Sequence, residues 1–171
     1  TLTSSAIFGD GAVVKITATI LKTNTNEVTK TRSRAQLVHV INDSDGAVYG
    51  TSSIHKDISL GKSDGYRVWA IYDSGTAGTA ATLPEFDVGS SIVGTPVRGE
   101  VITGGTSGAR GILINETNPF AYALIGTTDF SVGETVTGFE SGATATVGTI
   151  TTGSTLVTTS YDFDNGQRDN Y

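Results

Sequence analysis

The chain has 171 residues, a formal net charge of -6, and neither cysteine nor methionine. Its length suits one large or two small folded units, because such units usually hold roughly 100 to 200 residues. The lack of cysteine excludes disulfides and thiolate zinc sites, and no stretch approaches the roughly 18 consecutive apolar residues of a membrane helix. We therefore expect no membrane insertion. The absence of methionine leads us to expect a segment of a longer parent chain.

The negative charge is concentrated in the second half of the chain. Residues 1–84 contain eight Lys or Arg and seven Asp or Glu, a net +1, whereas residues 85–171 contain three and ten, a net -7. Because an acidic surface repels phosphate groups, we expect no binding of nucleic acid there. Lys30, Arg32 and Arg34 alternate with small residues and predict one basic face of a strand, without the interleaved aromatic residues of a nucleic-acid groove.

Short strands and tight turns are the structure that this glycine- and threonine-rich composition favours. Alternating apolar residues predict a strand over residues 11–22, and a second strand is expected over residues 28–40. The sequence NDSDG at residues 42–46 predicts a turn. Residues 65–73 place large side chains on both faces, as a strand in a sandwich does. We therefore expect an all-β protein whose residues 1–83 form a β-sandwich, immunoglobulin-like or similar.

The next segment, residues 74–83, has small side chains and two glycines, which is typical of a linker, a loop or an extended edge. We expect a domain boundary there or just past Pro84. Two tandem 34-residue β-repeats, hairpin- or barrel-like, are then expected over residues 84–153. Residues 154–171 predict a last strand, a turn at Asn165-Gly166 and the start of a continuation into the parent chain.

An internal repeat is the most informative pattern in the sequence. Residues 99–109, GEVITGGTSGA, match residues 133–143, GETVTGFESGA, at seven of eleven positions. Each copy predicts a strand, a turn at T-G-x-x-S-G and a second strand. A hairpin cannot bury its face alone, so the copies should pack on each other, on the sandwich or on neighbouring chains. The repeated residues that we expect to serve the structure are Gly99, Glu100, Gly104, Gly108, Gly133, Glu134, Gly138 and Gly142.

Histidines and acidic clusters give no clear site. His39 lies in an apolar segment and is expected to be structural, and His55 is expected in a loop or at a strand edge. NDSDG and the later DFDNG, residues 162–166, resemble the start of a calcium-binding loop, but both fail its register. Turn formation by Asp and Asn is the simpler interpretation. We expect no metal site and no cofactor.

Catalytic motifs are also missing from the glycine-rich repeats. GGTSGARG, residues 104–111, lacks the Lys-Ser/Thr pair of a phosphate-binding loop. Two acids that meet in space, among them Glu85, Glu100 and Glu134, would suit hydrolysis of a glycosidic bond, and the sequence leaves this alternative open. Glu100 and Glu134, however, occupy equivalent repeat positions, which favours a repeated structural task such as accepting hydrogen bonds from turn amides. We therefore predict that the chain is not an enzyme.

Two binding functions stay open as alternatives. Tyr66, Trp69 and Tyr72 lie in the strand predicted for residues 65–73, where aromatic side chains usually belong to the core. They could instead form a platform for stacking sugars of a host surface polysaccharide. T-x-T pairs also occur in ice-binding surfaces, which need a flat and regular array; here they lie at residues 17–19, 135–137 and 144–146.

Four sequence features together carry a resemblance to a family. They are HKDISLG at residues 55–61, TLPEF at residues 82–86, the tandem GExxTGxxSGA copies and, most specific, DNGQRDNY at residues 164–171. In this combination the chain resembles virion structural and tail-fibre-like proteins of tailed bacteriophages, notably those that infect marine cyanobacteria. The resemblance implies a virion location in the tail or a tail appendage, no catalytic residues, and a long parent chain that forms homo-oligomers and contacts other virion proteins.

We therefore predict a non-enzymatic segment of a phage tail, tail fibre or baseplate appendage that serves assembly and display. A carbohydrate-binding module that recognises host surface glycans is the alternative.

Overall fold

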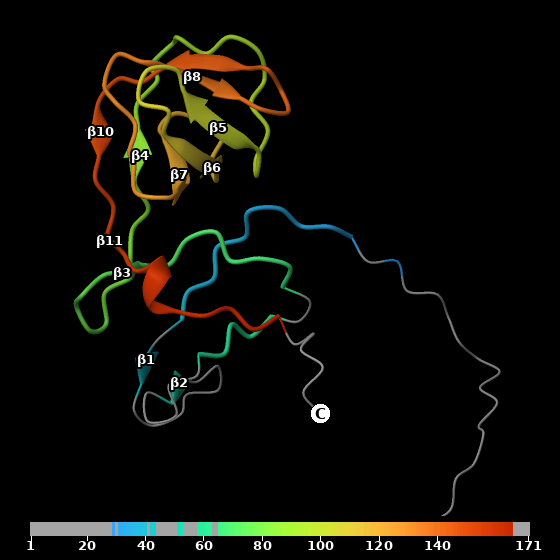
Figure 1. Ribbon diagram of the computed structural model, residues 1–171, viewed down its shortest axis with the longest axis vertical. Helices are drawn as coiled ribbons and strands as arrows, with labels where there is room; N and C mark the ends of the chain where they lie inside the picture. Colours follow the sequence, from blue (N-terminus) through green and yellow to red (C-terminus); the bar gives the residue numbers. More distant parts are fainter. Residues whose placement is uncertain are drawn as a thin grey trace, which may run out of the picture. The chain divides into compact units, whose positions relative to one another are not determined.

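Strands and loops make up almost all of the described chain, as its composition predicts. The computed structural model describes residues 29, 31–40, 42–43, 51–52, 58–62 and 65–165 (Figure 1). The contacts divide the chain into two units, and all described residues except 29, 31 and 32 belong to the second, Ser33–Tyr171. The single helical element in these ranges is the 3₁₀ turn η1 (Thr158–Ser160), and no helix there could cross a membrane. The prediction of an all-β protein is confirmed.

Eleven strands of two to six residues lie in the described part of the chain. In chain order they are β1 (Asn42–Asp43), β2 (Thr51–Ser52), β3 (Tyr72–Asp73), β4 (Glu85–Phe86), β5 (Val101–Gly104), β6 (Arg110–Leu113), β7 (Phe120–Ile125), β8 (Thr135–Gly138), β9 (Thr144–Thr146), β10 (Ile150–Thr151) and β11 (Thr155–Leu156). β1 and β2 form a parallel pair, and β3 and β11 form an antiparallel pair.

Seven strands form one antiparallel sheet in the order β10-β4-β7-β6-β5-β8-β9. Its end strands, β9 and β10, come from one short stretch of chain, and that stretch also bonds to the residues that follow β4. Asp87 O accepts from Gly148 N–H at 2.7 Å, and Val93 and Thr144 exchange two backbone hydrogen bonds of 2.8 and 2.9 Å. The sheet therefore curls until its two ends meet (Figure 1). We call this curled sheet, residues 85–151, the barrel.

Side chains fill the inside of the barrel. Aromatic rings form its centre: Phe86 lies 5.3 Å from Tyr122 and 5.4 Å from Phe130 between ring centroids, and Tyr122 meets Phe130 edge to face at 5.0 Å. The Tyr122 hydroxyl donates to Asp129 Oδ1 at 2.6 Å. Burial, and then the bond to this carboxylate, raise the pKa of Tyr122. The buried core consists of Phe86, Val88, Ile102, Ala109, Leu113, Phe120, Tyr122, Phe130, Val136, Ala145 and Val147.

The outer face of β6 and β7 carries a second apolar cluster. Ile112, Ile114 and Ala123 are buried there, and residues from the preceding part of the chain, including Trp69 and Leu83, pack against them. Residues before the barrel thus cover two of its strands from outside.

The strand predicted over residues 28–40 is wrong for the part that the structure describes. Residues 31–40 contain no strand, and Leu37, Val38 and His39 are exposed. His39 is therefore not a buried structural imidazole, and Arg32 and Arg34 do not share a strand face. Residue types alternate in this segment as they do in a strand. No strand in the described ranges pairs with it, however, so the segment is not part of a sheet.

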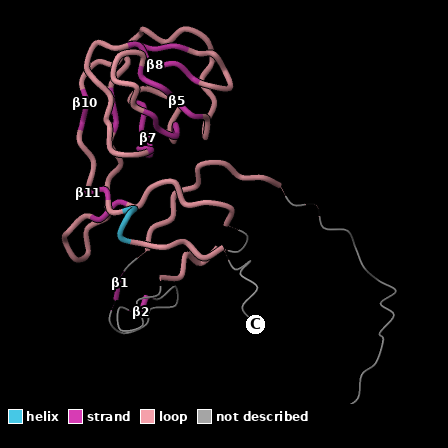
Figure 2. Tube along the Cα trace, in the orientation of Figure 1, coloured by secondary structure: helices cyan, strands magenta, loops and turns pink. Residues whose placement is uncertain are grey.

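The strand predicted over residues 65–73 is also mostly wrong, because only Tyr72 and Asp73 adopt it. Loops prevail in residues 58–62 and 65–83 (Figure 2), and those at residues 74–83 agree with the predicted linker or loop. The last predicted strand begins as expected at Thr155 but ends at Leu156, before η1.

Several expectations lie outside the described residues: the strand at residues 11–22, His55, and parts of the NDSDG and DFDNG turns. The N-terminal sandwich and the division of the chain at residue 83 therefore stay predictions.

The aromatic core generates a direct stability test. Phe86→Ala is expected to lower the free energy of unfolding by about 3–5 kcal/mol, because it removes a fully buried ring and leaves a cavity. Phe139→Ala is the matched control, since this ring is 83% exposed, and should change stability by less than about 0.5 kcal/mol. Urea unfolding followed by fluorescence measures both. Equal effects of the two variants would contradict the described core.

Candidate functional site

Two buried carboxylates are the most unusual chemical feature of the described residues. Glu100 is 0% and Glu134 is 4% exposed. Burying an ionised carboxylate is costly unless hydrogen-bond donors replace the lost water. Donors surround both groups here, and no buried side-chain polar atom in the described ranges lacks a partner. These two glutamates and the turns that bind them form the candidate site.

Glu100, which precedes β5, binds a turn in the other copy of the repeat. Its Oε2 accepts from the backbone N–H groups of Glu140 and Ser141, each at 3.0 Å, and its Oε1 accepts from the Ser141 hydroxyl at 2.9 Å. Val97 N–H donates to Oε1 at 2.7 Å from within its own copy. We call this set of bonds the first clamp; it fixes the turn between β8 and β9.

Glu134, which precedes β8, makes the same contacts in the opposite direction. Its Oε2 accepts from the backbone N–H groups of Thr106 and Ser107, each at 2.9 Å, and its Oε1 accepts from the Ser107 hydroxyl at 2.7 Å. Ser131 N–H donates to Oε1 at 2.6 Å. This second clamp fixes the turn between β5 and β6. Each glutamate therefore holds the turn of the other copy.

The two copies are related by a local two-fold axis. β5 pairs with β8 in a register centred on Thr103 and Thr137, which are 34 positions apart. The equivalence extends beyond the matched sequence, because Phe86 pairs with Phe120, also 34 positions apart. The bond from Ile114 N–H to Ala121 O likewise has a counterpart from Gly148 N–H to Asp87 O. We therefore define a first repeat, residues 85–118, and a second repeat, residues 119–152.

The repeated glycines make room for the clamps. A Cβ at Gly138 would lie 2.6 Å from Glu100 Oε2, and a Cβ at Gly104 would lie 2.6 Å from Glu134 Oε2. The other four glycines have positive φ, which favours glycine on steric grounds. These angles are +81° and +86° for Gly99 and Gly133, and +67° for both Gly108 and Gly142. The structure thus places all eight predicted repeat residues in or beside the clamps.

Both glutamates are held in the ionised form. Burial acts to raise the pKa of Glu100, but bonds from Val97, Ser141 and Glu140 together outweigh it and lower that pKa below its usual value. The pKa of Glu134 is lowered in the same way, against the effect of burial, by bonds from Ser107, Ser131 and Thr106. A carboxylate with a lowered pKa and fully used lone pairs is a structural acceptor rather than a proton donor.

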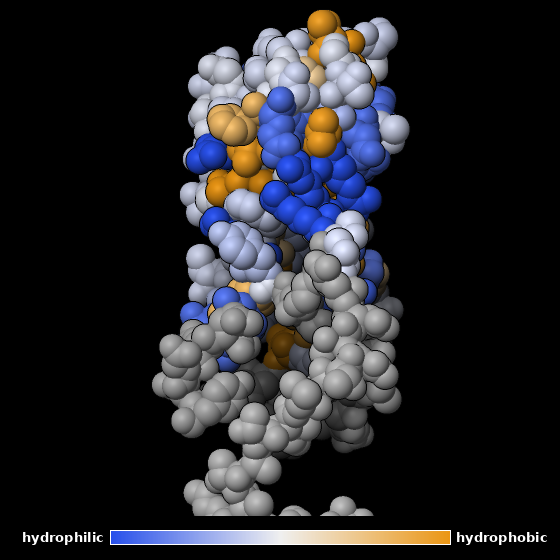
Figure 3. Space-filling view, turned by 90° about the vertical axis from the view of Figure 1, so that its right-hand side faces the viewer, coloured by the Kyte–Doolittle hydropathy of each residue, from blue (hydrophilic) through white to orange (hydrophobic). Residues whose placement is uncertain are grey.

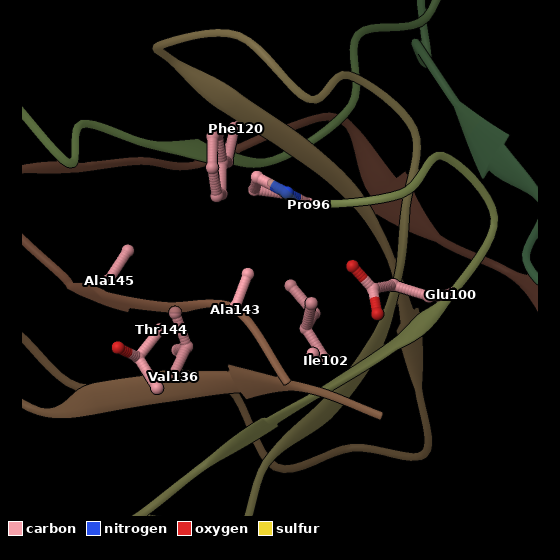
Figure 4. A pocket seen from close by; sticks show the side chains of 9 residues that line it. Pro96, Glu100, Ile102, Phe120, Val136, Ala143, Thr144 and Ala145 are labelled. Atoms are coloured by element: carbon pink, nitrogen blue, oxygen red, sulfur yellow. The ribbon is translucent and has the colours of Figure 1, made fainter. Parts of the chain in front are cut away.

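Space beside Glu100 is minimal. Its carboxylate points toward Pro96 and Ile102 at the edge of a cavity of about 10 Å³ (Figure 4). A cavity of this volume holds at most one water molecule. No substrate could reach Glu100 from this side.

Residues 33–36 cross the outside of the first clamp. The Arg34 guanidinium pairs with the Glu140 carboxylate, and Arg98 Nη2 donates to Ala35 O at 2.9 Å. The Arg34 side chain also lies against Gly99, where a Cβ would be 2.6 Å from Arg34 Cβ. We call residues 33–36 the strap.

The second clamp has a different outer surface. Val132 replaces Arg98 and Thr106 replaces Glu140 at the equivalent positions, so the charged contacts of the strap have no counterpart. Val132 is exposed, and a Cβ added at Gly133 would have no described atom within 4 Å. The two clamps therefore have the same internal hydrogen bonds but different residues on their outer surfaces.

The three aromatic residues of the expected sugar platform have different environments. Tyr66 is 93% exposed. Trp69 packs against the outer cluster of β6 and β7, and the Arg67 guanidinium lies 4.2 Å from the centre of its ring. The Tyr72 hydroxyl accepts from Leu124 N–H at 3.0 Å. Tyr66 is thus the only one of the three that is exposed, since Trp69 and Tyr72 are partly buried.

Other expected binding features do not assemble into a site either. The threonines of two T-x-T pairs are direct cross-strand partners, Thr135 with Thr146 and Thr137 with Thr144, but they lie on a curled sheet rather than a flat one (Figure 1). Within the described ranges, no three His, Asp or Glu side chains come together as metal ligands. A surface hollow of about 350 Å³ lies beside Leu37, Leu83 and Glu85.

Comparison of the chain with protein-family models, with curated proteins and with solved structures gives no match.

The crossed contacts predict an effect at a distance in sequence. Glu100→Gln should speed hydrogen exchange at the amides of Glu140 and Ser141 about tenfold or more, and leave Thr106 and Ser107 little changed. Glu134→Gln should do the reverse. Each substitution replaces an acceptor oxygen with an NH₂ group that faces other donors, and should cost about 2–4 kcal/mol of stability. Amide exchange followed by NMR measures this, and faster exchange confined to the substituted copy would contradict the crossing.

The lowered pKa values predict a pH dependence of stability. A carboxylate whose pKa is lower in the folded than in the unfolded chain stabilises the fold above its unfolded pKa, about 4.3 for Glu. That contribution is lost as the pH falls through the folded pKa. The free energy of unfolding should therefore decrease below about pH 4.5, and the decrease should be smaller in Glu134→Gln. Urea unfolding at pH 7, 4 and 3 checks this, and identical decreases in both proteins would contradict a role for Glu134.

Proposed function

We propose that the chain is a non-enzymatic structural segment of a bacteriophage virion, part of a tail, tail fibre or baseplate appendage, that serves assembly and display. The observation that carries the structural part of this proposal is the pair of clamps. Both buried carboxylates are used to join two repeats, and the cavity beside Glu100 holds at most one water molecule. The phage assignment is supported by the sequence resemblance, above all by DNGQRDNY at residues 164–171.

The physical properties of the barrel suit a spacer. Its interior is filled by aromatic and aliphatic side chains, and its two tight turns are fixed by charge-assisted hydrogen bonds, which are shorter and stronger than neutral ones. The chain has no cysteine, so the shape of this module does not depend on a disulfide. A rigid module of this kind can hold neighbouring parts of a long chain at a defined separation.

Contacts with other subunits are favoured by exposed apolar side chains, which become buried when the subunits associate. Val93, Val132 and Phe139 are exposed on the barrel, at 68, 69 and 83%. On the face shown in Figure 3, hydrophobic residues form separate patches among strongly hydrophilic ones. Scattered apolar side chains are normal on a protein surface. They are compatible with contacts to further copies of the chain and to other virion proteins.

A carbohydrate-binding module is the second candidate, and the exposed ring of Tyr66 is the observation in its favour. Under the structural proposal, the chain binds no sugar on a glycan array. Saturable binding that Tyr66→Ala abolishes, while Phe139→Ala as the control for an exposed aromatic residue retains it, would favour the carbohydrate-binding function instead.

Two measurements test the structural proposal. Light scattering of the full-length parent protein should give a multimer, and a strictly monomeric parent would contradict the assembly role. Antibodies against residues 85–151 should label the tails of virus particles in electron micrographs. Labelling of extracts from infected cells without labelling of particles would contradict the virion location.

A further inference from the structure

The contact surface between the two repeats is self-complementary. Each repeat presents one glutamate and one turn, and each receives the turn and the glutamate of its partner. The backbone follows the same rule: Gly105 N–H donates to Thr135 O at 2.9 Å, and Phe139 N–H donates to Val101 O at 2.8 Å. In an oligomer, such an interface between identical surfaces is the usual basis of a two-fold dimer. Here it occurs inside one chain.

A first repeat is therefore complementary to any second repeat, including that of another copy of the chain. If two chains exchanged these repeats, both clamps, the β5-β8 and β4-β7 pairs and the aromatic core would form again with the same residues. The exchanged and unexchanged forms differ only where the two repeats are joined. Exchange of this kind needs no new interface, which makes it a low-cost route to dimers.

The joining segment is suited to such a change. Residues 115–119 connect β6 to β7; Asn115 is partly exposed and the other four are exposed. Some hydrogen bonds of this segment are local, from Asn115 Nδ2 to Pro119 O at 3.2 Å and from the Thr117 hydroxyl to Asn115 Oδ1 at 2.9 Å. Three bonds tie it to the rest of the barrel: from Val88 N–H to Asn118 Oδ1 at 2.7 Å, from Asn115 N–H to Ala121 O at 3.3 Å, and between the side chains of Asn118 and Asp87. Extending this segment would uncover no core side chain.

We propose that two copies of the chain exchange repeats, so that each barrel combines the first repeat of one copy with the second repeat of the other. The partner copy then supplies one glutamate and one turn to each pair of clamps. This inference rests on the proposed assembly function and names the contact through which copies join. Many copies held together in an appendage would have a high effective concentration, which favours exchange over closure within one chain.

Cysteine trapping tests the exchange directly, because the natural chain has no cysteine. Thr103 and Thr137 are exposed cross-strand partners in β5 and β8, and such partners have Cα atoms about 5 Å apart, within the reach of a disulfide. A Thr103→Cys chain is mixed with a Thr137→Cys chain, unfolded, refolded together and oxidised. Exchange predicts a mixed disulfide between the two chains, because each cysteine meets its partner only across copies.

The matched control mixes Thr103→Cys with Thr146→Cys, which is also exposed but pairs with Thr135. The first mixture should give mixed disulfides at least tenfold faster than the control. Equal rates would overturn the exchange. If the parent protein is multimeric but the rates are equal, exchange is wrong and the assembly function stands; a strictly monomeric parent would contradict both.

A complementation experiment provides a second readout. One chain carries Glu100→Gln and Gly104→Ala, which damage the first repeat, and the other carries Glu134→Gln and Gly138→Ala, which damage the second. Each chain alone loses both clamps, whereas a mixed dimer contains one barrel with two intact repeats. Slow amide exchange at Ser107 and Ser141, at least tenfold slower than in either chain alone, is expected only after mixing. No change on mixing would overturn the proposal.

Discussion

The barrel depends on two buried, negatively charged carboxylates. In place of water, each one accepts hydrogen bonds from N–H and O–H groups of the protein. Glu100 and Glu134 each lie in the interior and each take their hydrogen bonds from the backbone and a serine hydroxyl. Backbone N–H groups are fixed in direction, so this solution requires a turn whose amides converge on one point. The T-G-x-x-S-G sequence supplies such a turn twice.

The other residues that the two repeats share follow from that requirement. A carboxylate that approaches the start of a turn needs a residue without a Cβ, which explains Gly104 and Gly138. The turn itself needs positive φ at Gly108 and Gly142. Because each glutamate reaches across to the other copy, these local requirements also bring β5 beside β8.

Predictions from the sequence were correct where they were based on the internal repeat. The identities around Glu100 and Glu134 predicted the hairpins and a role for the carboxylates in binding turn amides. They left open whether the copies pack on each other, on the sandwich or on neighbouring chains. They did not predict that the contacts are crossed, because a repeat shows which residues are equivalent but not which copy each one touches. The 34-residue spacing of Phe86 and Phe120 was available as a further signal that the repeat is longer.

Predictions from the sequence failed where period-two alternation was the only evidence. Residues 31–40 and 65–71 alternate as strands do, yet the structure shows no strand in either. Alternation of apolar and polar residues indicates that one side of a segment is buried and the other is exposed. An irregular segment that packs against the barrel, such as the one that contains Trp69, also has one buried and one exposed side. Whether a neighbour completes the backbone hydrogen bonds depends on distant residues, as β3 shows by pairing with β11.

The strap makes the two ends of the nearly two-fold symmetric barrel different. A two-fold core by itself has equivalent ends, and modules with equivalent ends can join head to head as readily as head to tail. Arg34 and Arg98 mark one end, while Val132 leaves the corresponding place apolar and open at the other. Polarity of this kind is what a linear appendage requires if its successive modules are all to point the same way.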